Sequence, residues 1–231
     1  MSLAFPITAA VIAAACGWRA SGVIAGLSEP PGPATRPGSA AAPDSAARPI
    51  PRSARWLTPL ISAALVLAAT LRLHQVLIAG AACWLVLCGV PLAVIDLRVR
   101  RLPDALTGAC IAGIATLLTA AAVVSGHVQS LARAGLAAAS VALFFALLAL
   151  ARPGSAGLGD AKLGLSTGAF AAWFGWGVLL TSLLAAFLLA AGYGLYLLAT
   201  RRATLPGGSL PFGPFLLAGC LLTTLLAGAV S

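Results

Sequence analysis

The chain has 231 residues, of which 61% are hydrophobic and only 8% are charged. A soluble domain carries about 25% charged residues, so a water-soluble fold is nearly excluded. The mean hydropathy of +1.04 instead predicts an all-α polytopic integral membrane protein. The net charge of +9 does not indicate nucleic-acid binding, because the basic residues lie singly or in short groups between apolar runs.

A membrane-spanning helix needs roughly 20 apolar residues, and about eight stretches of the chain meet or approach this length. In chain order they are residues 3–27, 56–73, 76–95, 105–125, 131–151, 163–175, 176–200 and 212–230. The sixth stretch is short, and its boundary with the seventh is poorly marked. A count of seven helices, with these two stretches joined, therefore stays open.

Residues 28–55 separate the first two stretches and hold seven of the fifteen prolines, together with Ala, Ser and Arg. This composition offers almost nothing to bury and is typical of a disordered linker. We therefore predict a first transmembrane helix within residues 1–27, a cytoplasmic linker over residues 28–55, and a membrane domain of seven helices over residues 56–231.

The basic residues predict the orientation, because Lys and Arg concentrate on the cytoplasmic side of membrane proteins. If the linker faces the cytoplasm, twelve of the fourteen Lys and Arg residues lie on that side, and only Arg72 and Arg133 lie outside. This asymmetry predicts a multi-pass protein of the cytoplasmic (inner) membrane. Joining the sixth and seventh stretches would move Arg201 and Arg202 outside and weaken the asymmetry, which favours eight helices.

The chain has only five acidic residues, and two of them, Glu29 and Asp44, lie in the linker. The other three, Asp96, Asp104 and Asp160, lie at membrane edges, where a carboxylate near the bilayer core costs about 2.5 kcal/mol or more. The predicted orientation places all three on the cytoplasmic side. Asp96 directly follows the third stretch, and Asp160 ends the loop after the fifth. Asp104 follows Pro103 and fits a cap and dipole partner of the next helix, while Asp96 could also be an interfacial acid paired with a nearby Arg.

Two glycines, Gly157 and Gly159, precede Asp160 and allow extended or positive-φ backbone in this loop. Two carboxylates brought together at a low-dielectric boundary share a proton and titrate in two steps. One can then take a proton from water while the other donates to the peptide, as in aspartic proteases. The five cysteines form no CxxC pair and lie in apolar runs, which indicates packing rather than a metal site.

Three motifs occur in one order along the chain. Asp96 is separated by six residues from Pro103-Asp104-Ala105-Leu106-Thr107, then comes Gly157-Leu158-Gly159-Asp160-Ala161-Lys162-Leu163, and last Leu210-Pro211-Phe212-Gly213-Pro214-Phe215-Leu216. This order resembles the type IV prepilin peptidases, the bacterial GxGD membrane aspartic peptidases, from about residue 56 to the C-terminus. The resemblance implies Asp96 and Asp160 as the catalytic pair. It implies supporting roles for the other motif residues, which are Pro103, Asp104, Gly157, Gly159, Lys162, Pro211, Phe212 and Gly213. Lys162 either anchors the helix at lipid headgroups or holds Asp160 in its ionised form.

The resemblance implies a membrane aspartic endopeptidase that removes the basic leader from type IV or Flp-type prepilins or pseudopilins at the cytoplasmic face. Its implied partners are the precursor, membrane lipid and pilus or secretion assembly machinery, with no cofactor or metal. Longer family members carry two CxxC pairs and also methylate the new N-terminus. Residues 28–55 contain no cysteine, so we expect the short form without a zinc site or N-methyltransferase activity. A GxGD peptidase acting on other membrane or signal peptides, a small transporter and a catalytically idle assembly partner remain alternatives.

Overall fold

The computed structural model describes residues 52–73, 75–99, 103–151, 158–200 and 212–227. All regular secondary structure in these ranges is helical. The helices are α2 (Arg52–Arg72), α3 (Val76–Val99), α4 (Asp104–Ser125), α5 (Val128–Ala151), α6 (Leu158–Phe174), α7 (Trp176–Ala199) and α8 (Gly213–Ala227). The prediction of an all-α fold is confirmed, and each stretch predicted from residue 56 onward corresponds to one helix. The predicted first span and most of the linker lie outside the described residues.

Four of the described helices are long and apolar enough to cross a membrane by length and composition. They are Val76–Leu97, Asp104–Ser125, Val128–Ala151 and Trp176–Ala199, while Leu60–Arg72 and Gly213–Ala227 are shorter apolar helices. α3 is the most buried of the four long helices, and α5 and α7 expose most of their apolar side chains. In water such exposure would be costly, so these outer helices fit an apolar lipid environment.

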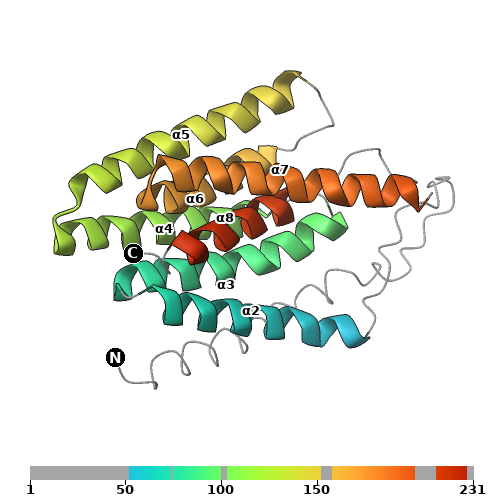
Figure 1. The fold of residues 1–231 in the computed structure, drawn as a ribbon, viewed down its shortest axis with the longest axis horizontal. Helices are drawn as coiled ribbons and strands as arrows, with labels where there is room; N and C mark the ends of the chain where they lie inside the picture. The colour runs from blue at the N-terminus through green and yellow to red at the C-terminus, as the bar shows by residue number, and fades with distance from the viewer. Residues whose placement is uncertain (1–51, 74, 100–102, 152–157, 201–211, 228–231) are drawn as a thin grey trace, which may run out of the picture.

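Consecutive helices reverse direction, so the connections fall alternately at the two ends of the bundle (Figure 1). At one end the connections are short and comprise residues 73–75, residues 126–127 and residue 175. At the other end the connections span residues 100–103, 152–157 and 200–212, of which most lie outside the described residues. All three sequence motifs flank these longer connections, so the topology alone gathers them at one end of the molecule.

Two of the short connections depend on glycine. Gly126 ends α4 in a left-handed conformation with φ 74°, and Gly175 separates α6 from α7 with φ 142°. Side chains disfavour both conformations, whereas glycine adopts them freely. The break at Gly175 answers the question that the sequence left open, because α6 and α7 are two helices.

Small residues let neighbouring helices approach closely. Gly164 and Gly168 of α6 are spaced as in the GxxxG packing motif. A β-carbon at these positions would lie 3.0 Å from Cγ1 and 3.2 Å from Cβ of Val141 on α5. Gly219 of α8 similarly meets α7, since a β-carbon there would lie 2.5 Å from the Ser182 carbonyl oxygen. Glycine backbone therefore packs against a side chain between α5 and α6, and against backbone between α7 and α8.

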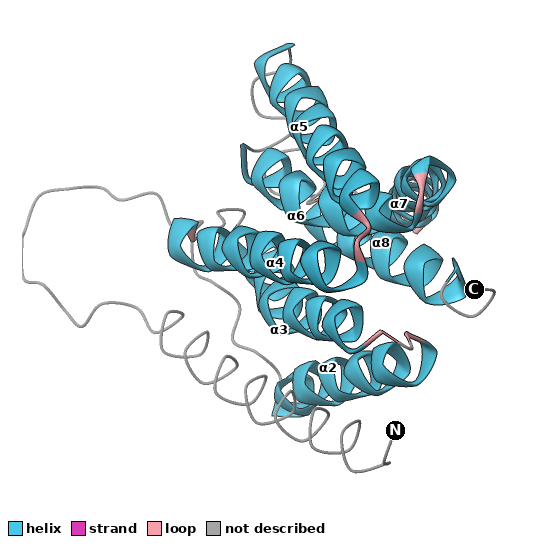
Figure 2. Cartoon of the chain, turned by 90° about the vertical axis from the view of Figure 1, so that its left-hand side faces the viewer, coloured by secondary structure: helices cyan, strands magenta, loops and turns pink. Residues whose placement is uncertain are grey.

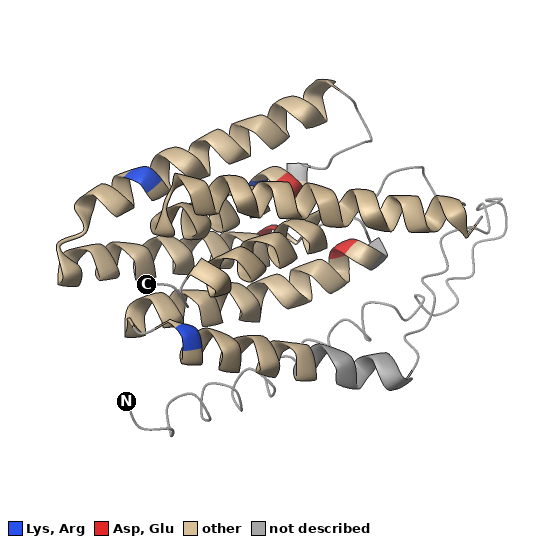
Figure 3. Ribbon diagram, in the orientation of Figure 1, with Lys and Arg blue, Asp and Glu red and all other residues tan. Residues whose placement is uncertain are grey.

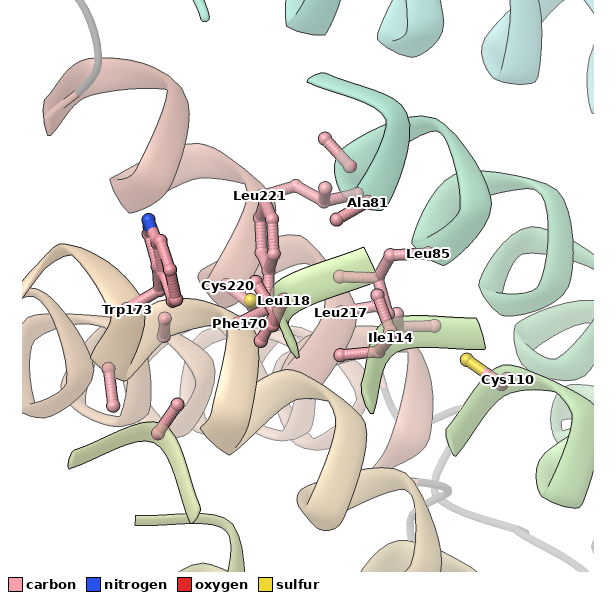
Figure 4. Packing of buried hydrophobic residues seen from close by; sticks show 14 of the residues in the cluster. Ala81, Leu85, Cys110, Ile114, Leu118, Phe170, Trp173, Leu217, Cys220 and Leu221 are labelled. Atoms are coloured by element: carbon pink, nitrogen blue, oxygen red, sulfur yellow. The ribbon is translucent and has the colours of Figure 1, made fainter. Parts of the chain in front are cut away.

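The apolar core lies between α3, α4, α6 and α8, whereas α2 and α5 occupy opposite edges of the bundle (Figure 2). Figure 4 shows the side chains that meet there, namely Leu85, Ile114, Leu118, Phe170, Leu217 and Leu221. Cys88, Cys110 and Cys220 are buried free thiols, and Cys83 is half-buried. The prediction that the cysteines serve packing is confirmed for these four, while Cys16 lies outside the described residues.

Arg133 holds the end of α6 at the short-connection end. Its Nε and Nη2 atoms donate to the carbonyl oxygens of Ala172 and Trp173, both at 2.6 Å. The last carbonyls of a helix have no partner within the helix, and a guanidinium fork can satisfy two of them at once. One of the two basic residues predicted on the outer side therefore has a structural role.

Candidate active site

The two motif carboxylates are buried in the bundle, and each is carried by a helix. Asp96 lies in the last turn of α3 and Asp160 in the first turn of α6, with exposed fractions of 6% and 5%. The prediction that Asp96 follows the helix and that Asp160 ends a loop was therefore wrong. α3 continues past the apolar run that ends at Ile95, and α6 begins before the apolar run that starts at Leu163. In Figure 3 the red acidic segments lie in one half of the bundle, away from the blue segments at the end of α2 and on α5.

Gly213 joins the third motif to the other two. A β-carbon at this buried position would lie 2.8 Å from Oδ2 of Asp96 and 3.5 Å from Cδ2 of Leu163. Leu163 lies one turn after Asp160 on the same helix. The start of α8 therefore packs directly against the carboxylate of α3 and beside the helix that carries the second carboxylate. No residue larger than glycine fits at position 213 without displacing one of these neighbours.

An ion pair bridges the first turns of α4 and α6. Nζ of Lys162 lies 2.5 Å from Oδ1 of Asp104, and the two side chains are 44% and 81% exposed. Asp104 is the first residue of α4, where a carboxylate also suits the helix dipole. Neither sequence-based role for Lys162 anticipated this partner. An exposed pair contributes about 1 kcal/mol at most, so its main effect is to fix where the first turn of α6 lies.

A group of phenylalanine rings holds the start of α8. The ring of Phe212, the residue before α8, lies 5.3 Å from the Phe145 ring of α5 and 4.9 Å from the Phe187 ring of α7. The carbonyl oxygen of Phe212 accepts the backbone N–H groups of Phe215 and Leu216 at 3.0 and 3.1 Å. Phe212 therefore anchors the first turn of the helix that reaches Asp96.

Residues 79–195 match the model of the type IV leader peptidase family. The chain belongs to this family. The match runs from α3 into α7, so it includes both motif carboxylates and the Asp104–Lys162 pair, while Gly213 lies beyond it. No curated protein and no solved structure is similar enough to the chain to match. Family membership confirms the resemblance seen in the sequence and, with the apolar helices, makes this leader peptidase a multi-pass membrane protease.

The remaining motif residues of the leader peptidase divide into described and undescribed positions. Pro103 precedes α4 in extended conformation, and its carbonyl oxygen accepts Oγ1 of the buried Thr107 at 3.1 Å. Gly159 lies in the first turn of α6, so the expectation of a loop with extended or positive-φ backbone was wrong at this residue. Gly157 and Pro211 lie outside the described residues. Within the described ranges, no three His, Cys, Asp or Glu side chains converge as metal ligands would.

Sequence reasoning missed Phe145 and Phe187. Both lie in the middle of apolar helices, where an aromatic residue carries no local signal that separates it from lipid-facing or core residues. Only the topology, which brings α5 and α7 to the start of α8, reveals their contact with Phe212. Residues at which three helices meet could be found from sequence only if the helix rotations were known.

Proposed function

We propose that this leader peptidase is an aspartic endopeptidase in which Asp96 and Asp160 form the catalytic pair. The observation that carries the proposal is their setting: two carboxylates on different helices are buried, Gly213 packs against Asp96 and Leu163, and Leu163 lies one turn after Asp160 on α6. Buried carboxylates in an apolar bundle are costly and are kept where they have a function. Two acids at the long-connection end of one protease therefore favour a shared catalytic role.

The proposed chemistry needs one proton shared between the two carboxylates, because low dielectric disfavours two adjacent negative charges. The ionised carboxylate takes a proton from the attacking water, and the protonated one donates its proton to the peptide carbonyl oxygen. As the tetrahedral intermediate collapses, the carboxylate that took the water proton passes it to the leaving amine and the C–N bond breaks, while a hydroxyl of the intermediate returns its proton to the other carboxylate as the C=O bond re-forms. The two carboxylates together again hold one proton, so the pair is ready for another turnover without a cofactor.

The proposed substrate is a type IV or Flp-type prepilin or pseudopilin, cut between its basic leader and its apolar helix at the cytoplasmic face of the inner membrane. The orientation rests on the positive-inside asymmetry, which puts the long connections, and hence Asp96 and Asp160, on the cytoplasmic side. The apolar outer surface contacts lipid, and pilus or secretion assembly machinery is the expected downstream partner. The absence of cysteine from residues 28–55 supports cleavage without N-methylation. Family membership disfavours the transporter alternative.

The experiment is a processing assay in which the full-length protein is expressed with a prepilin and the precursor is followed by gel shift. Replacing either carboxylate, as Asp96→Asn or Asp160→Asn, should slow processing at least ~100-fold, the usual contribution of a general acid or base. Asp44→Asn in the linker is the matched control and should process normally. Membrane abundance and thermal midpoint of each purified variant separate catalysis from folding. Normal processing by either Asp96→Asn or Asp160→Asn would overturn the assignment of the catalytic pair. Cleavage of only non-pilin signal peptides would overturn the proposed substrate class.

A further inference from the structure

Three rings from three parts of the chain meet beside the candidate site, and we name them the aromatic clamp: Phe145, Phe187 and Phe212. The ring of Phe144 also lies 5.3 Å from that of Phe145 and 6.4 Å from that of Phe187. Phe145 and Phe187 are nearly parallel, with an interplanar angle of 17° and ring centroids 6.5 Å apart. Phe212 lies within 5.3 Å of both and is tilted by about 43° to each. The ring of Phe212 is therefore held from α5 and α7 at the same time.

The clamp is connected to the Asp96 carboxylate by a short and stiff path. Phe212 and Gly213 are consecutive, and the Phe212 carbonyl accepts the first backbone hydrogen bonds of α8. A second ring contact, Tyr193 to Phe215 at 5.6 Å, fixes the same turn from α7. The backbone at position 213 has no room to move towards Asp96, since a β-carbon there would already lie 2.8 Å from Asp96 Oδ2. Any movement of the Phe212 ring is thus transmitted to the wall against which Asp96 packs.

The burial pattern separates this cluster from ordinary core packing. Phe145 is 1% exposed, but Phe187 is 41% exposed, so one of the three rings of the clamp contributes little to the buried core. Other contacts already join the helices concerned: α5 packs on the α6 glycines, and α7 packs on α8 at Gly219. The clamp instead contacts the one residue that sets where α8 begins. Its position is better suited to fixing the first turn of α8 than to holding the bundle together.

We infer that Phe145 and Phe187 are positioning residues for Asp96: through Phe212 they hold Gly213 against the carboxylate and so keep it in its reactive geometry. This inference rests on the proposed function, because it assumes that Asp96 reacts. Misplacing a catalytic group by about 1 Å costs up to roughly 100-fold in rate. The clamp therefore acts on the chemical step and not on substrate affinity.

The test compares purified full-length Phe187→Leu, Phe187→Tyr and wild-type enzyme on a prepilin in detergent, measuring kcat, KM and the pH–activity profile. We expect Phe187→Leu to lower kcat about tenfold with KM unchanged and to shift the pH profile, because the surroundings of the carboxylate change. Phe187→Tyr retains the ring and should restore kcat to within about twofold. Phe187→Met replaces Phe187→Leu if the leucine variant does not purify as a folded protein.

The matched control is Phe174→Leu, which removes a ring from the Phe170–Phe174 edge-to-face pair, 5.6 Å apart, near the end of α6 far from Asp160. It should lower the thermal midpoint and leave kcat unchanged. A rise in KM alone for Phe187→Leu would overturn the inference and make Phe187 a substrate contact. An unchanged kcat and pH profile would also overturn it. Asp96→Asn in the same assay separates the two proposals. If Asp96→Asn is inactive, a contrary result for Phe187→Leu overturns only the positioning role of the clamp. If Asp96→Asn is active, the proposed function itself is wrong.

Discussion

Replacing Gly213 with alanine should separate activity from stability in this protein. The added β-carbon would lie 2.8 Å from Oδ2 of Asp96, whereas ordinary contacts begin at 3.4 Å. Either the carboxylate or the start of α8 must then move by about 0.6 Å. Overpacking of this kind costs about 1–3 kcal/mol, but alanine regains about 1 kcal/mol in a helix. The net loss of unfolding free energy is therefore about 0–2 kcal/mol.

Cleavage should suffer more than stability, because a shift of this size at a reacting group lowers the rate about 10- to 100-fold. The assay measures the initial rate of prepilin processing and the thermal midpoint of the same purified sample. Gly192→Ala on α7 is the control, since a β-carbon at position 192 meets no atom within 4 Å. That variant should be slightly more stable and fully active. Wild-type processing by Gly213→Ala would refute the reasoning that the third motif forms the wall of the Asp96 site.

Two further predictions concern contacts that the sequence did not reveal. Asp104→Asn and Lys162→Met should each lower the unfolding free energy by less than about 1 kcal/mol and slow cleavage a few-fold. The double variant should be no worse than either single variant. Strictly additive losses of cleavage rate in this double-mutant cycle would show that the ion pair does not couple α4 to α6. Arg133→Met removes the guanidinium from two helix-end carbonyls, of which that of Ala172 still accepts the Gly175 N–H at 3.1 Å, and should lower the unfolding free energy by about 1–3 kcal/mol, measured by thermal denaturation. Arg133→Lys should recover only part of this loss, because an ammonium lacks the guanidinium fork, and a midpoint equal to wild type for Arg133→Met would contradict the capping role.

The helices from residue 56 onward could be predicted from sequence because their ends are marked by residues with a physical preference. Pro103 starts α4 and Gly126 ends it, and both positions follow from backbone preferences. Hydropathy alone did not mark the end of α3. The apolar run stops at Ile95 while the helix continues to Val99, since polar residues can extend a helix beyond the apolar core. The local structure predicted for Asp96 and Asp160 was therefore wrong, while their catalytic role stays a prediction.

The contacts between motifs could not be predicted, because they depend on how each helix is rotated about its axis. Asp104 and Lys162 are 58 residues apart, and nothing in either motif indicates that these two side chains form an ion pair. The topology of short and long connections predicts that both lie at one end, but not that they touch. The same holds for Gly213, whose motif was found in the sequence while its contact with Asp96 was not.

One end of the bundle carries the buried carboxylates, and the other end carries the contacts that stabilise the fold. A buried carboxylate lowers the stability of an apolar bundle, and the described chain buries two of them at the same end. The other end contains the devices that stabilise the fold: one-to-three-residue connections at Gly126 and Gly175, and the Arg133 contacts with α6. If this division of labour is correct, substitutions at the short-connection end should change the thermal midpoint with little effect on kcat. Substitutions around Gly213 should do the reverse, because the proposed catalytic carboxylate of Asp96 packs against this one small residue.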